Sequence, residues 1–232
     1  MPDRRGLSDL PYSKDYHIQK DVEDLDALLA KTGARSVFGL SSGALISLQA
    51  ALTLPTIHKI AIFEPPLYLN GAPIAALQRL EKEVAQGKLA AALITGMKTG
   101  QMGPAALRAM PYWLLKPLIN KIMTLEDKEG SGEYLPMKAL ASALQYDFQI
   151  VVEMSGQLQS FRTINPEVLL LGGSKSPAYL KVALDALEKV LPHAKRIEFP
   201  GLDHAAAWNY DKQRNPGGQP ELVAQELRRF FT

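Results

Sequence analysis

Residues 35–54, RSVFGLSSGALISLQAALTL, decide the fold of this chain. The stretch begins with a short apolar run, passes through GLSSG at 39–43, and continues as an apolar segment of helical length that ends before Pro55. A second short apolar run, HKIAIF at 58–63, follows at once. Strand, helix and strand with short connections predict a βαβ unit, and strands without apolar–polar alternation are typical of a parallel sheet covered by helices on both faces.

Elements of the same kind flank this unit. Apolar residues recur at helical spacing in IQKDVEDLDALLAK at 18–31, just before Gly33. The remaining expected elements are strands at 167–171 and 194–199, and helices at 177–191 and from Gln219-Pro220 to Phe231. The sequence therefore predicts an α/β fold.

Residues 73–163 differ in character because they contain only helical patterns, broken at Gly87, at 100–104 and at 129–132. An all-helical block inside an α/β chain indicates an insertion, often a lid over a site. We therefore expect an α/β core formed by 1–66 and 164–232, with a helical lid at 67–163.

Composition and charge exclude several classes of function. The 232 residues carry 26 Lys and Arg against 24 Asp and Glu, a net charge of +2, which provides no basic field for nucleic acid or a membrane surface. The absence of Cys excludes disulfides, thiolate catalysis and zinc–thiolate sites, and we expect neither a metal nor another cofactor. No apolar run reaches about 18 residues, and the polar N-terminal segment lacks the apolar centre of a signal peptide, so we expect a cytoplasmic protein that acts on a small molecule.

Ser41 is the candidate nucleophile. A serine at the centre of G-x-S-x-G, between a strand and a helix, is typical of the strained turn that exposes a reactive hydroxyl. We expect both Gly39 and Gly43 to be required, because a Cβ at either position would clash with nearby backbone. The helix N-terminus favours negative charge developing beside it, and the backbone N–H of Ser42 is the expected oxyanion donor.

His204 is the candidate general base, since a serine nucleophile needs a base and the base needs a group that orients it. It lies in FPGLDHAAA at 199–207, directly after the last expected strand, and catalytic groups in such sheets collect at the carboxyl ends of strands. The positions of His17, His58 and His193 favour structural roles.

An ordered set of motifs along nearly the whole chain resembles the α/β-hydrolase fold family. The motifs are Asp3-Arg4-Arg5-Gly6, the serine turn at Ser41, Glu64-Pro65-Pro66, LLLGG at 169–173, Gly201-Leu202-Asp203-His204, and the inserted helical block. The resemblance implies a parallel sheet and a triad of serine, histidine and a carboxylate.

The chain departs from this family at the triad acid. The family places Asp or Glu just after the third expected strand, where this chain has GGSKS at 172–176. A variant arrangement, similar to some haloalkane dehalogenases, carries the acid after the preceding strand, and that position is Glu64. Glu64 is therefore the expected partner of His204, with Asp203 and Asp147 as alternatives.

The resemblance also implies about four strands before the segment at 3–6, which here lies almost at Met1. Without them the strand before Ser41 becomes an unpaired apolar edge, which favours a homodimer formed through that edge. The family loop that donates a second oxyanion N–H is missing as well. We expect a gene product that starts upstream, completion of the site by another chain, or a weak catalyst.

The expected activity is hydrolysis of an ester or lactone of a small apolar molecule through an acyl-enzyme. In the helical segment, Trp113, Tyr146 and Asp147 are the candidate substrate contacts. Serine rather than Asp at the turn argues against dehalogenase chemistry. Acyl transfer or cyclisation in a secondary-metabolite pathway, and a non-catalytic pseudoenzyme, remain alternatives because one fold hosts many reactions.

Overall fold

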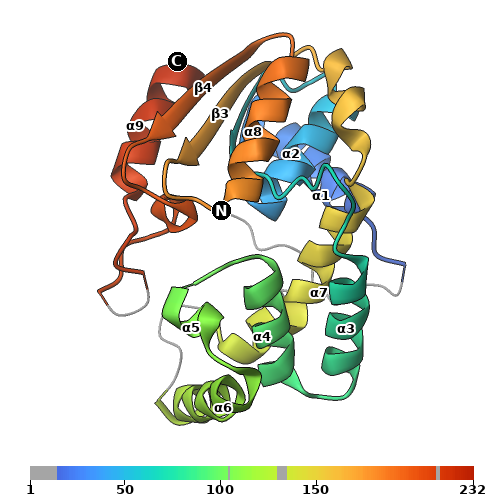
Figure 1. Ribbon diagram of the computed structural model, residues 1–232. Coiled ribbons are helices and arrows are strands. Elements are labelled where there is room, and N and C mark those ends of the chain that lie inside the picture. The colour runs from blue at the N-terminus through green and yellow to red at the C-terminus, as the bar shows by residue number, and fades with distance from the viewer. Residues whose placement is uncertain (1–14, 104, 130–134, 213–214) are drawn as a thin grey trace. The chain divides into compact units, whose positions relative to one another are not determined.

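The computed structural model describes residues 15–103, 105–129, 135–212 and 215–232. These residues form two compact units (Figure 1). The sheet unit comprises His17–Ala72 and Glu153–Thr232, and the helical unit comprises Pro73–Val152 together with the segment that ends at Tyr16. The Asp3-Arg4-Arg5-Gly6 motif lies outside the described residues.

The sheet unit is built on four parallel strands in the order β1-β2-β3-β4: β1 (Ser36–Leu40), β2 (Lys59–Phe63), β3 (Glu167–Gly173) and β4 (Ala194–Phe199). The strands lie where the apolar runs predicted them. Leu40 pairs with Phe63, and Phe63 pairs with Leu171, so the carboxyl ends of neighbouring strands meet at one edge. Within the described ranges β1 pairs with β2 alone, which places β1 at the side of the sheet.

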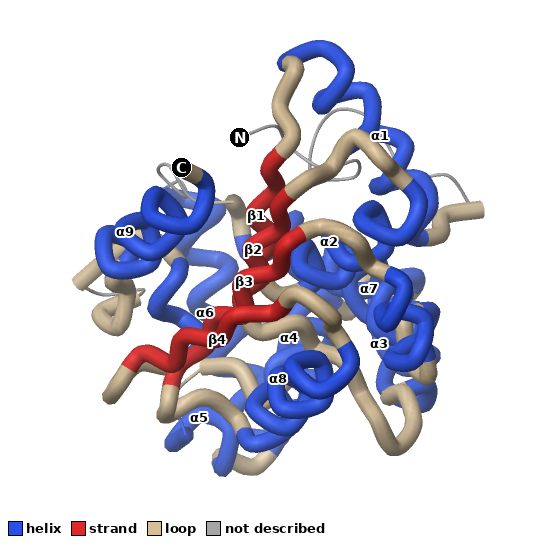
Figure 2. Tube along the Cα trace, turned by 90° about the horizontal axis from the view of Figure 1, so that it is seen from above, coloured by secondary structure: helices blue, strands red, loops and turns tan. Residues whose placement is uncertain are grey.

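Helices cover both faces of this sheet (Figure 2). One face carries α9 (Pro220–Phe231), whose buried Val223 shares an apolar cluster with Phe63 and Leu171. The other face carries α1 (Ile18–Thr32), α2 (Ser42–Thr53) and α8 (Ala178–Val190). Burial on both faces explains why the two central strands, β2 and β3, are apolar without alternation, since removing apolar surface from water is the main favourable term in folding.

The helical unit contains α3 (Ile74–Ala85), α4 (Leu89–Thr99), α5 (Ala105–Ala109), α6 (Tyr112–Glu129) and most of α7 (Met137–Glu153). The described part of this unit has no strand, as the sequence predicts. Leu80, Leu115 and Ala141 are fully buried in its core. The buried carboxylate of Glu83 is satisfied within the unit, because Arg79 Nε and Thr95 Oγ1 donate to it at 2.8 and 2.7 Å.

Two boundaries differ from those expected. Residues 67–72 and 153–163 group with the sheet unit rather than with the helical block. The helical pattern expected over the rest of the block, up to residue 163, ends at Glu153, because Gly156 adopts a left-handed φ of 80° and a 3-10 helix, η1 (Gln157–Thr163), follows it. No helix in the described part of the chain is long and apolar enough to cross a membrane.

Candidate active site

Ser41 stands at the turn between β1 and α2 in a strained backbone conformation. Its φ of 55° and ψ of −121° lie outside the regions that non-glycine residues ordinarily occupy. Hydrogen bonds on both sides hold this conformation: the Ser41 N–H donates to the Phe63 carbonyl at 2.9 Å, and the Ser41 carbonyl accepts from the Ala44 N–H at 2.9 Å. The turn therefore has the shape expected for a serine presented at the end of its strand.

Only one of the two glycines around Ser41 is sterically required. A Cβ on Gly39 would lie 2.3 Å from the Gly43 carbonyl oxygen and 2.4 Å from Ser47 Oγ, so no side chain fits there. A Cβ on Gly43 would meet nothing within 4 Å outside the backbone of its own helix. The expectation that both glycines are required is wrong for Gly43.

Glu64 follows β2 directly and is completely buried. Its own N–H donates to the Leu171 carbonyl at 3.1 Å, and its φ of 47° is the second strained value at this edge of the sheet. Both carboxylate oxygens have partners: Oε1 accepts from the Gly173 N–H at 2.7 Å, and Oε2 lies 2.7 Å from His204 Nδ1. A buried carboxylate with two charge-assisted contacts is held in one orientation.

The two glycines at the end of β3 make room for this arrangement. A Cβ on Gly172 would lie 2.6 Å from Leu184 Cδ1 and 2.9 Å from Glu64 Oε1. A Cβ on Gly173 would lie 2.3 Å from the Leu202 carbonyl oxygen, in the loop that leads to His204. GGSKS thus contributes space and one N–H at the place where the family pattern has an acid. The sequence analysis recognised that the family's carboxylate is missing here, but it did not predict that these residues make room for Glu64 and bind it.

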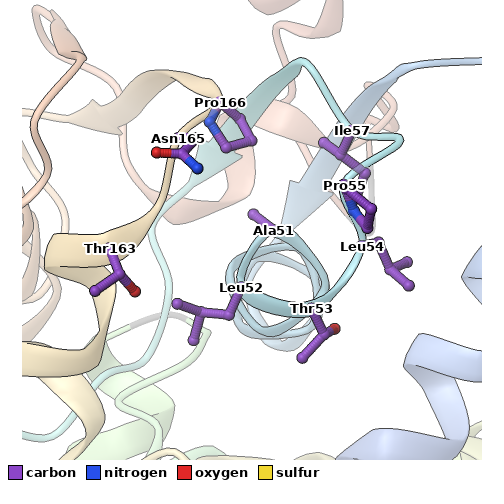
Figure 3. Close-up of a pocket in the computed structure, with 9 residues that line it drawn as sticks. All are labelled: Ala51, Leu52, Thr53, Leu54, Pro55, Ile57, Thr163, Asn165 and Pro166. Atoms are coloured by element: carbon purple, nitrogen blue, oxygen red, sulfur yellow. The ribbon is translucent and has the colours of Figure 1, made fainter.

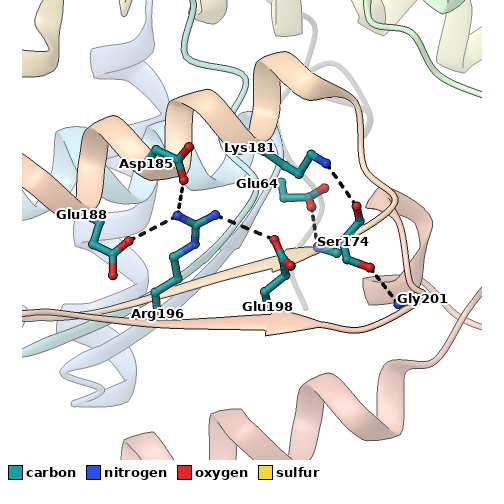
Figure 4. Close-up of polar contacts among 9 residues, drawn as sticks. Glu64, Ser174, Lys181, Asp185, Glu188, Arg196, Glu198 and Gly201 are labelled. Carbon is teal, nitrogen blue, oxygen red and sulfur yellow. Dashed lines mark hydrogen bonds and ion pairs between the residues drawn. The ribbon is translucent and has the colours of Figure 1, made fainter.

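His204 begins the short 3-10 helix η2 (His204–Ala207), and the loop before it is tied to the end of β3. Ser174 Oγ accepts from the Gly201 N–H at 2.8 Å, and the Ser174 carbonyl accepts from Lys181 Nζ at 3.1 Å (Figure 4). Arg196 on β4 adds ion pairs that connect this strand to α8, one of them to Glu188 at 3.2 Å. The imidazole is therefore positioned by the two strands that follow Glu64 in the sheet.

The contact with Glu64 determines the tautomer of His204. A carboxylate only accepts hydrogen bonds, so Nδ1 carries the hydrogen, and in the neutral imidazole the free lone pair is on Nε2. Two aromatic rings flank the imidazole: Phe63 at 6.4 Å and Trp208 at 5.9 Å between ring centroids. Trp208 is 45% exposed, and sequence reasoning missed it although it lies one helical turn beyond the histidine.

Ser41 and His204 lie at the same edge of the sheet, each of them beside Phe63. The Ser41 N–H is bonded to the Phe63 carbonyl, and the ring of Phe63 contacts the imidazole. Across the described ranges, no hydrogen bond joins the Ser41 hydroxyl to His204. Hydrogen bonds of catalytic groups often tighten only when substrate is bound.

The other predicted site residues lie as follows. Ser42 is the first residue of α2, so its N–H lies in the helical turn whose dipole favours negative charge. Asp203 caps η2, because its Oδ1 accepts from the Ala205 N–H at 3.0 Å. Trp113, Tyr146 and Asp147 all belong to the helical unit.

Two of those helical-unit residues have distinct surroundings. The side chain of Trp113 on α6 is 71% exposed. Tyr146 on α7 packs edge-on against Tyr16 with ring centroids 5.2 Å apart, and burial raises the pKa of its phenol.

A pair of tyrosines beside Glu64 has no counterpart in the sequence analysis. The rings of Tyr68 and Tyr179 stack with centroids 5.1 Å apart, and their hydroxyls share a hydrogen bond. Burial is the main cause that raises the pKa of Tyr179, and Tyr68 and the negative charge of Glu64 raise it further. Both phenols are therefore neutral at physiological pH, and nothing in the spacing of residues 68 and 179 indicated that they would meet.

A cavity of about 280 Å³ lies at the other end of the strands (Figure 3). Its lining comes from the C-terminal end of α2 and from segments just before β2 and β3, including Ile57 and Pro166. Since these segments precede the strands, whereas Ser41, Glu64 and His204 follow them, the cavity is separate from the candidate site. Among the described residues, no group of three or more His, Asp or Glu side chains is placed to bind a metal ion.

Comparison with solved structures identifies the fold. An α/β hydrolase from Sphaerobacter thermophilus matches with a TM-score of 0.71 and 27% identity, over 99% of this chain and 80% of that chain. The chain has the α/β-hydrolase fold. Two less similar structures share this fold. They are a hydrolase from Pseudomonas aeruginosa (TM-score 0.67, 17% identity, 99% and 77% covered) and a structure from a study of carboxylesterases of Nitrososphaera gargenis (0.61, 16%, 99% and 79%). No family model and no curated protein matches the sequence.

Proposed function

We propose that this α/β-hydrolase-fold protein is a serine hydrolase that cleaves an ester or lactone of a small apolar molecule. The observation that carries the proposal is the 2.7 Å contact between His204 Nδ1 and the buried carboxylate of Glu64, at the same sheet edge as the strained Ser41. The hydrolases among the similar solved structures support the reaction class.

The proposed reaction proceeds in two halves. Ser41 Oγ attacks the carbonyl carbon while its proton passes to His204 Nε2, and the Ser42 N–H stabilises the negative charge on the former carbonyl oxygen. The C–O bond to the alcohol then breaks, and His204 returns the proton to the leaving alkoxide. Water attacks the acyl-enzyme in the same way, with His204 as base, and releases the acid and free Ser41.

Glu64 acts on the imidazole and not on the substrate. Its Oε2 holds the Nδ1 hydrogen and stabilises the imidazolium that forms when Nε2 takes the serine proton. The Gly173 N–H holds the other oxygen, so the carboxylate cannot rotate away. The ring of Trp208, which is exposed beside His204, supports an apolar substrate.

A labelling experiment tests this function. The protein is incubated with a fluorophosphonate probe, and the modified peptide is identified by mass spectrometry. We expect one adduct on Ser41, none in Ser41→Ala, and normal labelling in Ser160→Ala, whose serine is exposed in η1. Hydrolysis of p-nitrophenyl butyrate is expected to follow the same pattern. Folded protein that gives neither an adduct nor hydrolysis would identify a non-catalytic member of the fold family.

A further inference from the structure

Trp208, in the sheet unit, is an exposed aromatic residue in contact with the candidate general base. Its indole ring meets the imidazole of His204 edge-on, with ring centroids 5.9 Å apart and planes inclined at 71°. Trp208 is nevertheless 45% exposed. Single exposed aromatic residues are common on protein surfaces, but this one touches the group that moves protons in the proposed reaction, which places apolar surface where a substrate would bind.

Hydrogen bonds on both sides hold the backbone around Trp208. Trp208 directly follows η2, and its N–H donates to the Ala205 carbonyl at 3.1 Å. The side-chain amide of Asn215 donates to the Ala205 carbonyl at 3.1 Å and to the Asn209 carbonyl at 3.0 Å. Asn215 thus uses both amide hydrogens to bridge the two ends of the short segment that carries Trp208.

Close packing restricts this segment further. Gly218 is buried, and a Cβ on it would lie 2.6 Å from the Trp208 carbonyl oxygen. The next residue, Gln219, donates its N–H to the Ala206 carbonyl at 2.9 Å. The main chain therefore holds Trp208 next to His204 before a substrate binds, which lowers the entropy cost of using its ring as a binding surface.

The imidazole determines which part of an ester would reach this ring. His204 Nδ1 faces the buried carboxylate of Glu64, so Nε2 is the nitrogen available to the reacting groups. Nε2 must come within about 3 Å of the alcohol oxygen to protonate it as it leaves. The first atoms of the alcohol group then lie beside the imidazole and within reach of a ring that touches it, whereas the acyl chain extends from the carbon bound to Ser41 Oγ.

We propose, on the basis of the serine hydrolase function proposed above, that Trp208 is a specificity-determining residue that binds the alcohol group of the substrate, and that this group is aromatic. An aromatic alcohol group can pack face-to-face or edge-on against the indole ring, and such ring pairs are favourable in addition to the apolar area that they bury. A small alcohol group such as ethyl covers little of the ring. The effect of Trp208 on activity should therefore depend on the alcohol group of the ester.

Two esters that share an acyl group test this role. We expect Trp208→Ala to lower kcat/KM by about 10–100-fold for 2-naphthyl butyrate and by less than about three-fold for ethyl butyrate. Each variant is compared with the unmodified protein on the same ester, so the different reactivity of the two leaving groups cancels. Tyr210→Ala is the matched control, because Tyr210 is an exposed aromatic residue of the same segment, and it should leave both values nearly unchanged.

The step that follows departure of the alcohol separates binding from a purely structural role. Both esters leave the same butyryl group on Ser41, and its hydrolysis needs His204 but no longer involves the alcohol. We expect Trp208→Ala to hydrolyse the butyryl-enzyme at nearly the unmodified rate, measured by mass spectrometry after rapid quenching. The product 2-naphthol should inhibit hydrolysis of ethyl butyrate competitively, and its inhibition constant should rise by at least about ten-fold in Trp208→Ala.

The outcomes distinguish this role from the proposed function. If the folded, unmodified protein hydrolyses neither ester, the proposed function is refuted, and the role of Trp208 with it. If Trp208→Ala lowers both kcat/KM values equally or leaves both unchanged, the function stands and only the role of Trp208 is refuted. Slow hydrolysis of the butyryl-enzyme in Trp208→Ala would show instead that the ring supports His204.

Circular dichroism establishes that each variant is folded. Trp208→Leu keeps apolar volume beside η2 but has no aromatic ring, so it replaces the alanine variant if that variant does not fold. We expect the same selective loss of activity towards 2-naphthyl butyrate in Trp208→Leu, and an equal loss for the two esters would again refute the role of Trp208.

Discussion

Replacing Glu64 by Gln tests the proposed site most directly, because the substitution changes one atom and almost no volume. The side chain is fully buried, with Oε1 on the Gly173 N–H and Oε2 on His204 Nδ1. In Glu64→Gln the Gly173 N–H still needs an acceptor, so the amide oxygen takes that place and the NH₂ group faces the imidazole. The opposite orientation would leave two buried donors facing each other.

The size of the expected loss of activity follows from the tautomer of His204. An NH₂ group facing Nδ1 makes that nitrogen an acceptor, so the ring hydrogen moves to Nε2 and the imidazole can no longer accept the proton of Ser41. Loss of the correct tautomer in a serine–histidine–acid triad lowers kcat by about 10⁴, equivalent to about 5 kcal/mol of transition-state stabilisation. We expect a decrease between about 10³ and 10⁴ for Glu64→Gln, with KM nearly unchanged.

The assay is hydrolysis of p-nitrophenyl butyrate under saturating conditions, with a thermal melt of each variant to establish folding. Asp203→Asn is the matched control, because the asparagine carbonyl can still cap η2 at the Ala205 N–H. We expect it to stay within a few-fold of the unmodified rate. If Glu64→Gln keeps more than a tenth of the activity, or if Asp203→Asn loses as much, the assignment of Glu64 is refuted.

Three further perturbations probe the structure around the site and in the helical unit. Gly39→Ala should prevent correct folding, because its Cβ would meet backbone at 2.3 Å, whereas Gly43→Ala should keep soluble, active protein, and the two are compared by soluble yield and circular dichroism. The raised pKa of Tyr179 means that the unfolded chain loses this proton before the folded protein does, so stability is complete below about pH 10 and falls as the pH rises beyond it. In Tyr179→Phe the free energy of unfolding, measured by urea melts at pH 8 and 11, should decrease less between these two pH values than in the unmodified protein. An equal decrease in the two proteins would contradict the role of Tyr179. Leu80→Ala should lower the free energy of unfolding by about 2–5 kcal/mol in urea melts, because Leu80 is fully buried, and a loss below about 1 kcal/mol would show that its site collapses.

Most of the fold could be read from local patterns. The four strands, the helices between them and the helical block each follow from a run of residues whose spacing matches one periodicity, and such signals depend only on near neighbours. The candidate nucleophile Ser41 and the candidate base His204 were identifiable in the same way, since Ser41 directly follows β1 and His204 lies in the loop after β4. Where a local signal was ambiguous the prediction was less accurate, as at Gly156, where the apolar pattern continued past the true end of α7.

The sequence by itself determined which residue types stand at the carboxyl ends of the strands. It also predicted Glu64 as the partner of His204, with two other carboxylates as alternatives. Only the tertiary structure shows that it is Glu64 that contacts His204, because this contact joins residues 140 positions apart. Its geometry depends on the parallel register of β2 and β3, on the positive φ of Glu64, and on the space left by Gly172. Long-range register and close packing are properties of the assembled sheet, and no local spacing encodes them.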